Sequence, residues 1–94
     1  MIEIIERHMV GGERHEHIAE VKYVNGSGQT KRATREAMVE WLDTSDANKA
    51  IVRSQTNRSL YAYVGTVHPQ HLPAYIRTYA DHEWTDNLLA LPKY

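Results

Sequence analysis

The chain contains no cysteine and no phenylalanine. The first absence excludes a disulfide framework and any metal site built on thiolates, and it fits a reducing compartment, so we expect a cytoplasmic protein. The second leaves six tyrosines and two tryptophans as the large aromatic residues. Because tyrosine hydroxyls need partners or water, we expect the core to use mainly Ile, Val, Leu and tryptophan.

An excess of charge of one sign is also missing. The chain has 11 basic and 12 acidic residues and a formal net charge of -1. Phosphate backbones and anionic membranes attract clustered Lys and Arg, so nucleic acid is a disfavoured partner and no membrane association is expected. Acidic residues interrupt the first apolar segment, residues 1–7, which excludes a signal peptide or a membrane span there.

Several chemical motifs are absent as well. The sequence has no phosphate-cradling glycine loop, no nucleophile elbow and no ordered Ser-His-Asp set. We therefore expect no cofactor, and the sequence favours a protein that is not an enzyme. With 94 residues, it has room for one domain, residues 1–94. Such a small domain has modest stability, which the formation of a homodimer would increase.

Alternating apolar residues and turn signals predict about six short strands and one helix. Regular alternation in the second strand would place Ile18 and Val24 on one face and Val21 on the other. Thr34 is positioned to cap an amphipathic helix over 35–42, and a short helical turn is expected at Leu88 and Leu89. The expected strands cover residues 2–10, 17–24, 29–33, 50–53, 60–67 and 74–80.

These elements indicate the α+β class. We expect a small, mainly antiparallel and curved sheet, with the helix across one face or end. Hairpin-like connections allow the sheet either to remain open or to close into a small barrel.

Aromatic residues and one arginine alternate along the last two strands, and this pattern gives the main candidate site. If the two strands pair, these side chains share one face of the sheet. Tyrosine rings could stack on a planar ligand, and the guanidinium could bind a phosphate or carboxylate. The structural alternative is that the tyrosines simply cover the sheet. The residues of this predicted face are Tyr61, Tyr63, Tyr75, Arg77 and Tyr79.

Two further groups could take part in binding. Polar and aromatic residues follow the last strand, where acids could act as a general acid and base or have ordinary turn and capping roles. A basic cluster of Lys31, Arg32 and Arg35 begins the helix, where an anion would be favoured, although a solvated cluster is the commoner explanation. The residues of the turn are Asp81, Trp84, Asp86 and Asn87.

Two closely spaced histidines, His15 and His17, provide a metal alternative. Residues two apart on a strand point to the same face, so the pair could share a zinc or nickel ion. No third ligand forms a recognisable motif with them, and no metal is favoured. With Asp81 or Asp86, these histidines also define the alternative of a small hydrolase that acts through a water molecule.

Three segments together resemble a family of small bacterial and phage proteins of unknown function, number 3892. The resemblance covers residues 3–92 and rests on His15–Ile18, on Thr34–Trp41 and on the segment from Tyr75 to Pro92. It implies a shared fold and assigns no activity. The polar signature that the resemblance implies consists of His17, Arg35, Arg77, Thr78, Asp81, Trp84, Asp86 and Asn87.

The leading hypothesis is a non-enzymatic binding module. Its aromatic and arginine face would recognise a protein partner, a second copy of the chain or a small anionic, nucleotide-like ligand. The hydrolase is the first alternative. Binding of single-stranded nucleic acid is the second, with tyrosines as stacking platforms and a basic set of Lys31, Arg32, Arg35, Arg53 and Arg58.

Overall fold

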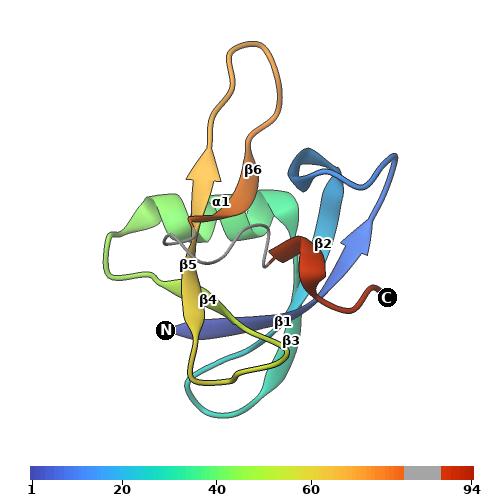
Figure 1. Ribbon diagram of the computed structural model, residues 1–94. Helices are drawn as coiled ribbons and strands as arrows, with labels where there is room; N and C mark the ends of the chain where they lie inside the picture. The colour runs from blue at the N-terminus through green and yellow to red at the C-terminus, as the bar shows by residue number, and fades with distance from the viewer. Residues whose placement is uncertain (80–87) are drawn as a thin grey trace.

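The computed structural model describes residues 1–79 and 88–94. In this part of the chain, six strands form one sheet in the order β3-β2-β1-β4-β5-β6 (Figure 1). β1 and β4 are parallel, and every other neighbouring pair is antiparallel. The strands are β1 (Ile2–Met9), β2 (Ile18–Val24), β3 (Thr30–Thr34), β4 (Ala50–Arg53), β5 (Tyr61–Val67) and β6 (Tyr75–Tyr79).

The helix α1 (Arg35–Thr44) begins where the sequence predicts, directly after β3. The hydroxyl of Thr34 accepts a hydrogen bond from the backbone N–H of Ala37 at 3.1 Å, which satisfies one of the free amides of the first turn. At the other end, the side-chain amide of Asn48 donates to the carbonyl of Trp41 at 2.7 Å. Two short 3-10 helices, η1 (His15–His17) and η2 (Leu88–Ala90), complete the fold.

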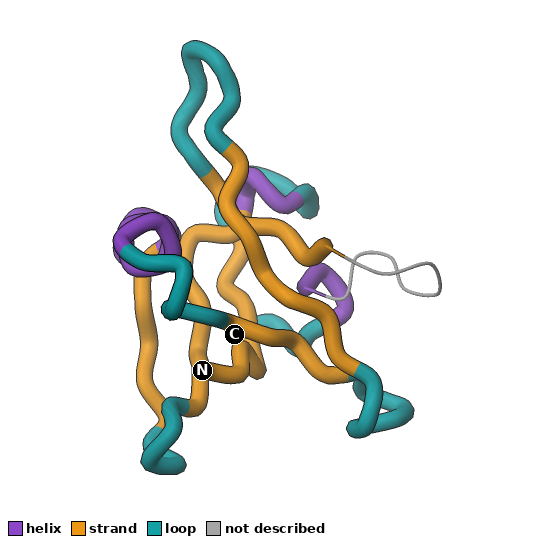
Figure 2. Tube along the Cα trace, turned by 90° about the vertical axis from the view of Figure 1, so that its left-hand side faces the viewer, coloured by secondary structure: helices purple, strands orange, loops and turns teal. Residues whose placement is uncertain are grey.

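The sheet is open, so the α+β class and mainly antiparallel sheet are confirmed, while closure into a barrel is not found. Its edges are β3 and β6. β3 is mostly exposed and carries Lys31 and Arg32, charges of the kind that prevent edge strands from pairing further. The β5–β6 hairpin projects from the body of the molecule, with its connecting loop at the tip (Figure 2). Leu72 in this loop is 68% exposed.

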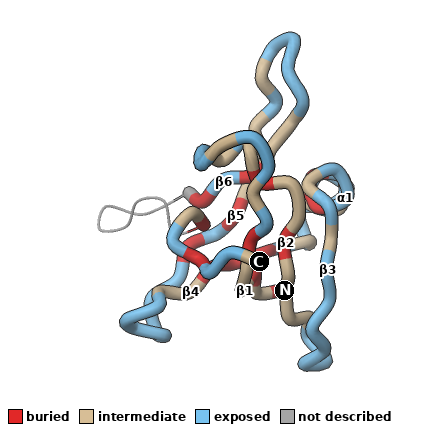
Figure 3. Tube along the Cα trace, turned by 90° about the vertical axis from the view of Figure 1, so that its right-hand side faces the viewer, coloured by how far each residue is buried: buried red, intermediate tan, exposed pale blue. Residues whose placement is uncertain are grey.

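The core lies between the sheet and α1 (Figure 3). Met38 and Val39 are the buried residues of the helix, and Leu88 and Leu91 close the core from the C-terminal segment. Trp41 and Leu42 are partly buried and pack against its margin. The fully buried large side chains of the described residues are Ile4, Ile18, Ile76, Leu88, Val21 and Val52.

The regular alternation predicted for the second strand was wrong. Ile18 and Val21 are both fully buried although they are three residues apart. Met9 pairs with Ile18 and His8 pairs with Glu20, so Ala19 is an extra residue on β2. Such a bulge reverses the sense of the alternation beyond it.

A second bulge reverses the alternation on β1. Ile4 pairs with Tyr23 and Glu6 pairs with Lys22, which leaves Ile5 as the extra residue on this strand. Consequently Ile4 and Arg7 are both buried, although a regular strand would point them to opposite faces. Arg7 is therefore turned toward the interior.

Within residues 1–79 and 88–94, no helix reaches the length and apolarity needed to cross a membrane.

The turn after β1 leaves no room for a side chain at Gly12. A Cβ atom there would lie 2.6 Å from Cε1 and Nδ1 of His17. The His17 ring holds this position because its Nδ1 accepts a hydrogen bond from the backbone N–H of Arg14 at 3.2 Å. An alanine must therefore push the ring away and break that bond.

We expect Gly12→Ala to lower the free energy of unfolding by about 1 kcal/mol, as measured by urea denaturation. Gly26→Ala is the matched control, because nothing lies within 4 Å of a Cβ atom at Gly26 and its φ is not positive. The control should be neutral or slightly stabilising. Equal losses in both variants would contradict the packing of His17 described above.

Candidate functional site: the outer face of β4, β5 and β6

Tyr61 and Tyr63 lie on the face of β5 that points away from the core. They are 49% and 48% exposed, whereas Ala62 and Val64, which alternate with them, are buried at 5% and 6%. Strand period explains this arrangement, since successive residues point to opposite sides of the sheet. The part of the prediction that placed these two tyrosines on one exposed face is confirmed. We call the surface of β4, β5 and β6 on this side the outer face.

The two tyrosine rings are in contact with each other and with an arginine. Their centroids are 5.8 Å apart in an edge-to-face arrangement, a favourable geometry for aromatic pairs. Arg53 is directly opposite Tyr61 in the β4–β5 register, and its guanidinium carbon lies 5.7 Å from the centre of the Tyr61 ring. This distance allows a cation–π contact, so the side chains form an ordered surface.

Glu3 connects this cluster to β1 and to a second arginine. Its carboxylate lies 3.4 Å from Nε of Arg53 and 2.6 Å from Nη2 of Arg58. Arg53 also donates from Nη1 to the carbonyl of Arg58 at 3.0 Å. Both guanidinium groups therefore share one carboxylate, which offsets one of their two positive charges. Charge alone grouped the two arginines in the sequence, and Glu3, which is far from both along the chain, gave no signal there.

β6 continues the outer face. Its register with β5 places Tyr79 opposite Tyr63, and Arg77 opposite Gly65. Arg77 is exposed, and Tyr75 is half-buried. The pairing of the last two strands, which was the condition for the predicted face, is present. Asp81, Trp84, Asp86 and Asn87, which were predicted to add to this surface, lie outside the described residues.

Arg35 does not belong to the outer face. It starts α1, which packs on the opposite side of the sheet. Its Nη1 donates to the carbonyl of Glu16 at 2.7 Å, and its Nε lies 3.4 Å from the Glu36 carboxylate. Arg35 therefore connects α1 to η1. The structure thus separates the basic cluster of Lys31, Arg32 and Arg35 from the exposed tyrosines.

His15 and His17 lie in η1, so the expectation that they sit at the same side of a strand was wrong. In a 3-10 helix, residues two apart are separated by about two thirds of a turn, which points their side chains in different directions. Among the residues that the structure describes, no three His, Asp or Glu side chains are grouped to hold a metal ion. The hydrolase alternative also needs Asp81 or Asp86, and it stays a prediction.

At the end of α1, the carboxylate of Asp43 links a histidine and a hydroxyl. The hydroxyl of Thr66 donates to Oδ1 of Asp43 at 2.7 Å, and Nε2 of His68 lies 2.8 Å from Oδ2. In a nucleophilic triad, the imidazole stands between the hydroxyl and the carboxylate. Here the carboxylate stands in the middle, so the contacts attach the end of α1 to β5 and do not activate the hydroxyl.

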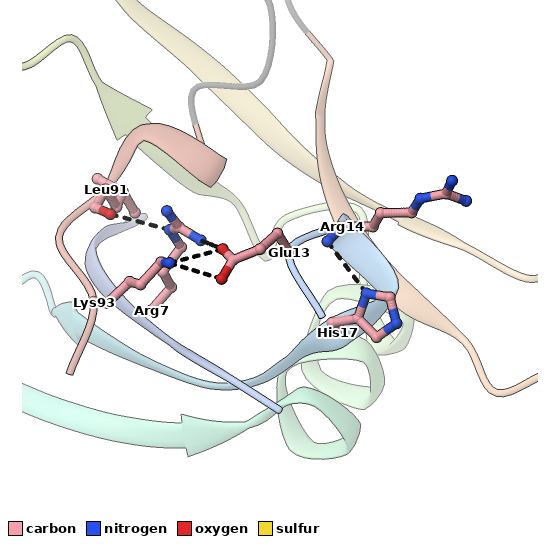
Figure 4. A network of polar contacts seen from close by, with 6 residues as sticks. All are labelled: Arg7, Glu13, Arg14, His17, Leu91 and Lys93. Atoms are coloured by element: carbon pink, nitrogen blue, oxygen red, sulfur yellow. Dashed lines mark hydrogen bonds and ion pairs between the residues drawn. The ribbon is translucent and has the colours of Figure 1, made fainter. Parts of the chain in front are cut away.

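Among the residues that the structure describes, Arg7 is the buried charged residue (Figure 4). Arg7 is 7% exposed, and its Nε donates to the carbonyl of Leu91 at 3.0 Å. Its Nη1 lies 3.8 Å from the Glu13 carboxylate, which also accepts a hydrogen bond of 2.8 Å from Lys93. This hydrogen bond lowers the pKa of Glu13 below its ordinary value. The network attaches the C-terminal segment to β1.

Tyr94 is fixed at the other end of this segment. Its hydroxyl donates to Glu20 at 2.8 Å, and the ammonium of Lys22 lies 4.6 Å from the centre of its ring. His8 also contacts the backbone oxygen of Tyr94. Burial, followed by the hydrogen bond to Glu20, raises the pKa of the Tyr94 hydroxyl well above its ordinary value.

We expect one tyrosine to ionise later than the others when the absorbance at about 295 nm is followed with pH, and Tyr94→Phe should remove this late component. Because the folded pKa is raised, the associated stability is complete below about pH 10 and declines as the pH rises further. A late component that persists in Tyr94→Phe would show that another tyrosine is responsible.

The whole pattern of segments can now be compared with known proteins. A family model described as "Protein of unknown function (DUF3892)" matches residues 3–92. The chain belongs to this family. The resemblance identified from His15–Ile18, Thr34–Trp41 and the C-terminal segment is therefore confirmed. No curated protein and no solved structure matches the chain.

Proposed function

We propose that this DUF3892 protein is a non-enzymatic recognition module that binds a partner protein through its outer face. The observation behind the proposal is the pair of half-exposed tyrosines, Tyr61 and Tyr63, held edge to face on a strand beside Arg53. Tyrosine and arginine are enriched at the energetic centres of protein interfaces. Because the two rings contact each other and Tyr61 also contacts Arg53, less side-chain freedom remains to be lost on binding.

The charges of the outer face favour a protein over a small anion. The Glu3 carboxylate already pairs with both Arg53 and Arg58, so a free anion would have to compete with a carboxylate that lies 2.6 Å from Arg58. A protein surface can instead cover the tyrosines and leave these ion pairs at its rim. For single-stranded nucleic acid, the basic set is divided, because Arg53 lies beside Tyr61 whereas Arg35 starts α1 on the opposite side of the sheet.

The chain also lacks cysteine, which fits a reducing compartment, and we place the module in the cytoplasm. A second copy of the chain is one partner that the proposal includes. Size-exclusion chromatography with light scattering on wild type and on Tyr63→Ser distinguishes this homodimer from a complex with another protein.

The proposal is tested by quantitative affinity capture with the tagged protein. The double variant Tyr61→Ser/Tyr63→Ser should lose most of the partner that wild type captures, while its thermal midpoint falls by only a few degrees. Leu72→Ser is the matched control, because Leu72 is an exposed apolar residue at the tip of the β5–β6 hairpin. Capture that is unchanged in the double variant, or lost equally in the control, contradicts the proposal.

A further inference from the structure

A cleft of about 400 Å³ lies between the end of α1 and β5, beside the outer face. Its volume is at the small end of the range for ligand sites. Tyr63 lines it and also belongs to the outer face. The remaining lining residues come from the end of α1, the segment leading into β4, and β5, and they include Leu42, Asp43, Asp46, Asn48, Lys49 and Gly65.

The cleft exists because β5 is longer than β4. Ala50, the first residue of β4, pairs with Val64. From Gly65 to Val67, β5 continues with β6 as its partner, and the segment before β4 lies on its other side. Gly65 has no side chain to fill this space. The cleft is thus a consequence of the sheet register.

Most polar groups of the cleft are hydrogen-bond acceptors. Asn48 uses its side-chain N–H to bind the carbonyl of Trp41, which leaves its Oδ1 as an acceptor. Asp43 is fixed by Thr66 and His68. The Asp46 carboxylate forms no hydrogen bond or ion pair with any described residue and is exposed. A ligand that donates hydrogen bonds therefore complements these groups.

The charges around the cleft also favour a cationic ligand. Two carboxylates, Asp43 and Asp46, oppose the single ammonium of Lys49 in the lining. The last turn of α1 contains no basic residue, so no positive side chain of that turn offsets the negative end of its dipole. Tyr63 adds an aromatic surface that attracts cations. Cations are thus favoured over anions.

We infer that this cleft binds a guanidinium or primary ammonium group, supplied by an arginine or lysine side chain of the partner protein. The apolar part of such a side chain would lie against Leu42 and Tyr63, with its charged end among the acceptors of Asp46 and Asn48. The identity of the source rests on the proposed function, because a partner that covers Tyr63 must also pass over the mouth of the cleft. The cationic preference of the cleft does not depend on the proposed function.

The inference can be tested without the partner. N-acetyl-arginine amide and N-acetyl-lysine amide serve as cationic probes, and N-acetyl-glutamate amide and N-acetyl-norleucine amide as the anionic and neutral controls. Each is titrated into the ¹⁵N-labelled protein, and the backbone amide shifts of Asp46, Asn48 and Gly65 are followed. We expect saturable shifts at millimolar concentrations with the cationic probes alone.

Two charge variants should change this affinity in opposite directions. Asp46→Asn should weaken binding of the arginine probe about threefold, because it removes an unpaired carboxylate. Lys49→Gln should strengthen binding about twofold, because it removes a like charge. Neither side chain has a bonding partner among the described residues, so both variants are expected to fold normally.

Several outcomes would overturn the inference. These are an absence of saturable shifts, equal shifts with the norleucine probe, or stronger binding of the glutamate probe with loss of that binding in Lys49→Gln. Failure of the inference is separable from failure of the proposed function. The titration concerns only the cleft, whereas the capture experiment with Tyr61→Ser/Tyr63→Ser concerns the outer face. If the natural ligand were instead a free small-molecule amine, the arginine probe would bind, but Asp46→Asn would capture the partner as well as wild type does. This outcome would overturn the assignment of the cation to the partner protein.

Discussion

Replacing Arg7 with alanine should lower the free energy of unfolding by about 3 kcal/mol. The side chain of Arg7 is 9% exposed, and its Nε–H is the donor to the Leu91 carbonyl. Alanine would leave this carbonyl without its donor and would remove the packed aliphatic stem of the arginine. Urea denaturation followed by circular dichroism measures the loss.

Lys93→Ala is the matched control for this prediction. Lys93 belongs to the same network but is 51% exposed, so the loss of its ion pair with Glu13 should cost less than about 1 kcal/mol. Hydrogen exchange should also be faster at Tyr94 in Arg7→Ala, because its N–H bonds the carbonyl of residue 7. Similar stabilities of Arg7→Ala and Lys93→Ala would show that the buried guanidinium does not hold the C-terminal segment.

Substitutions beside the bulge on β2 should give the second large effect on the free energy of unfolding. Ile18→Ala should cost about 3 kcal/mol and Val21→Ala about 2 kcal/mol, since both side chains are fully buried. Val24→Ala tests the same chemical change at a half-buried position of the same strand and should cost less than about 1 kcal/mol. A regular strand would give the opposite order, with Val24 more sensitive than Val21.

Chemical denaturation of the three variants decides between these orders. Because Val21 and Val24 lose the same atoms, the comparison depends on burial and not on residue type. A cost at Val24 that equals or exceeds the cost at Val21 would show that Ala19 is not the bulged residue.

Much of the fold was predictable from local signals. Thr34 supplies the helix cap, and Asn25 fixes the turn after β2, with its Oδ1 accepting hydrogen bonds from the N–H groups of Ser27 and Gln29. Alternation of residue types located β5 and β6 and the exposed tyrosines of β5. These features depend on neighbours in the sequence, which is why a pattern of residues can reveal them.

The errors came from features that depend on distant parts of the chain. A bulge adds one residue without a sequence signal of its own, so the inward position of Arg7 could not be seen from alternation. The association of Glu3 with Arg53 and Arg58 requires the parallel pairing of β1 and β4. The cleft beside Tyr63 depends on the unequal lengths of two paired strands. An open sheet and a barrel differ only in whether their edges meet.

Site-specific photocrosslinking tests the central claim, that the outer face is the surface that meets the partner. The photoreactive amino acid p-benzoylphenylalanine would replace Tyr63 in one protein and Lys31, on the exposed edge strand β3, in another. After irradiation in cells, we expect a discrete crosslinked protein from position 63 and none from position 31. A crosslink from position 31 with none from position 63 would contradict the claim.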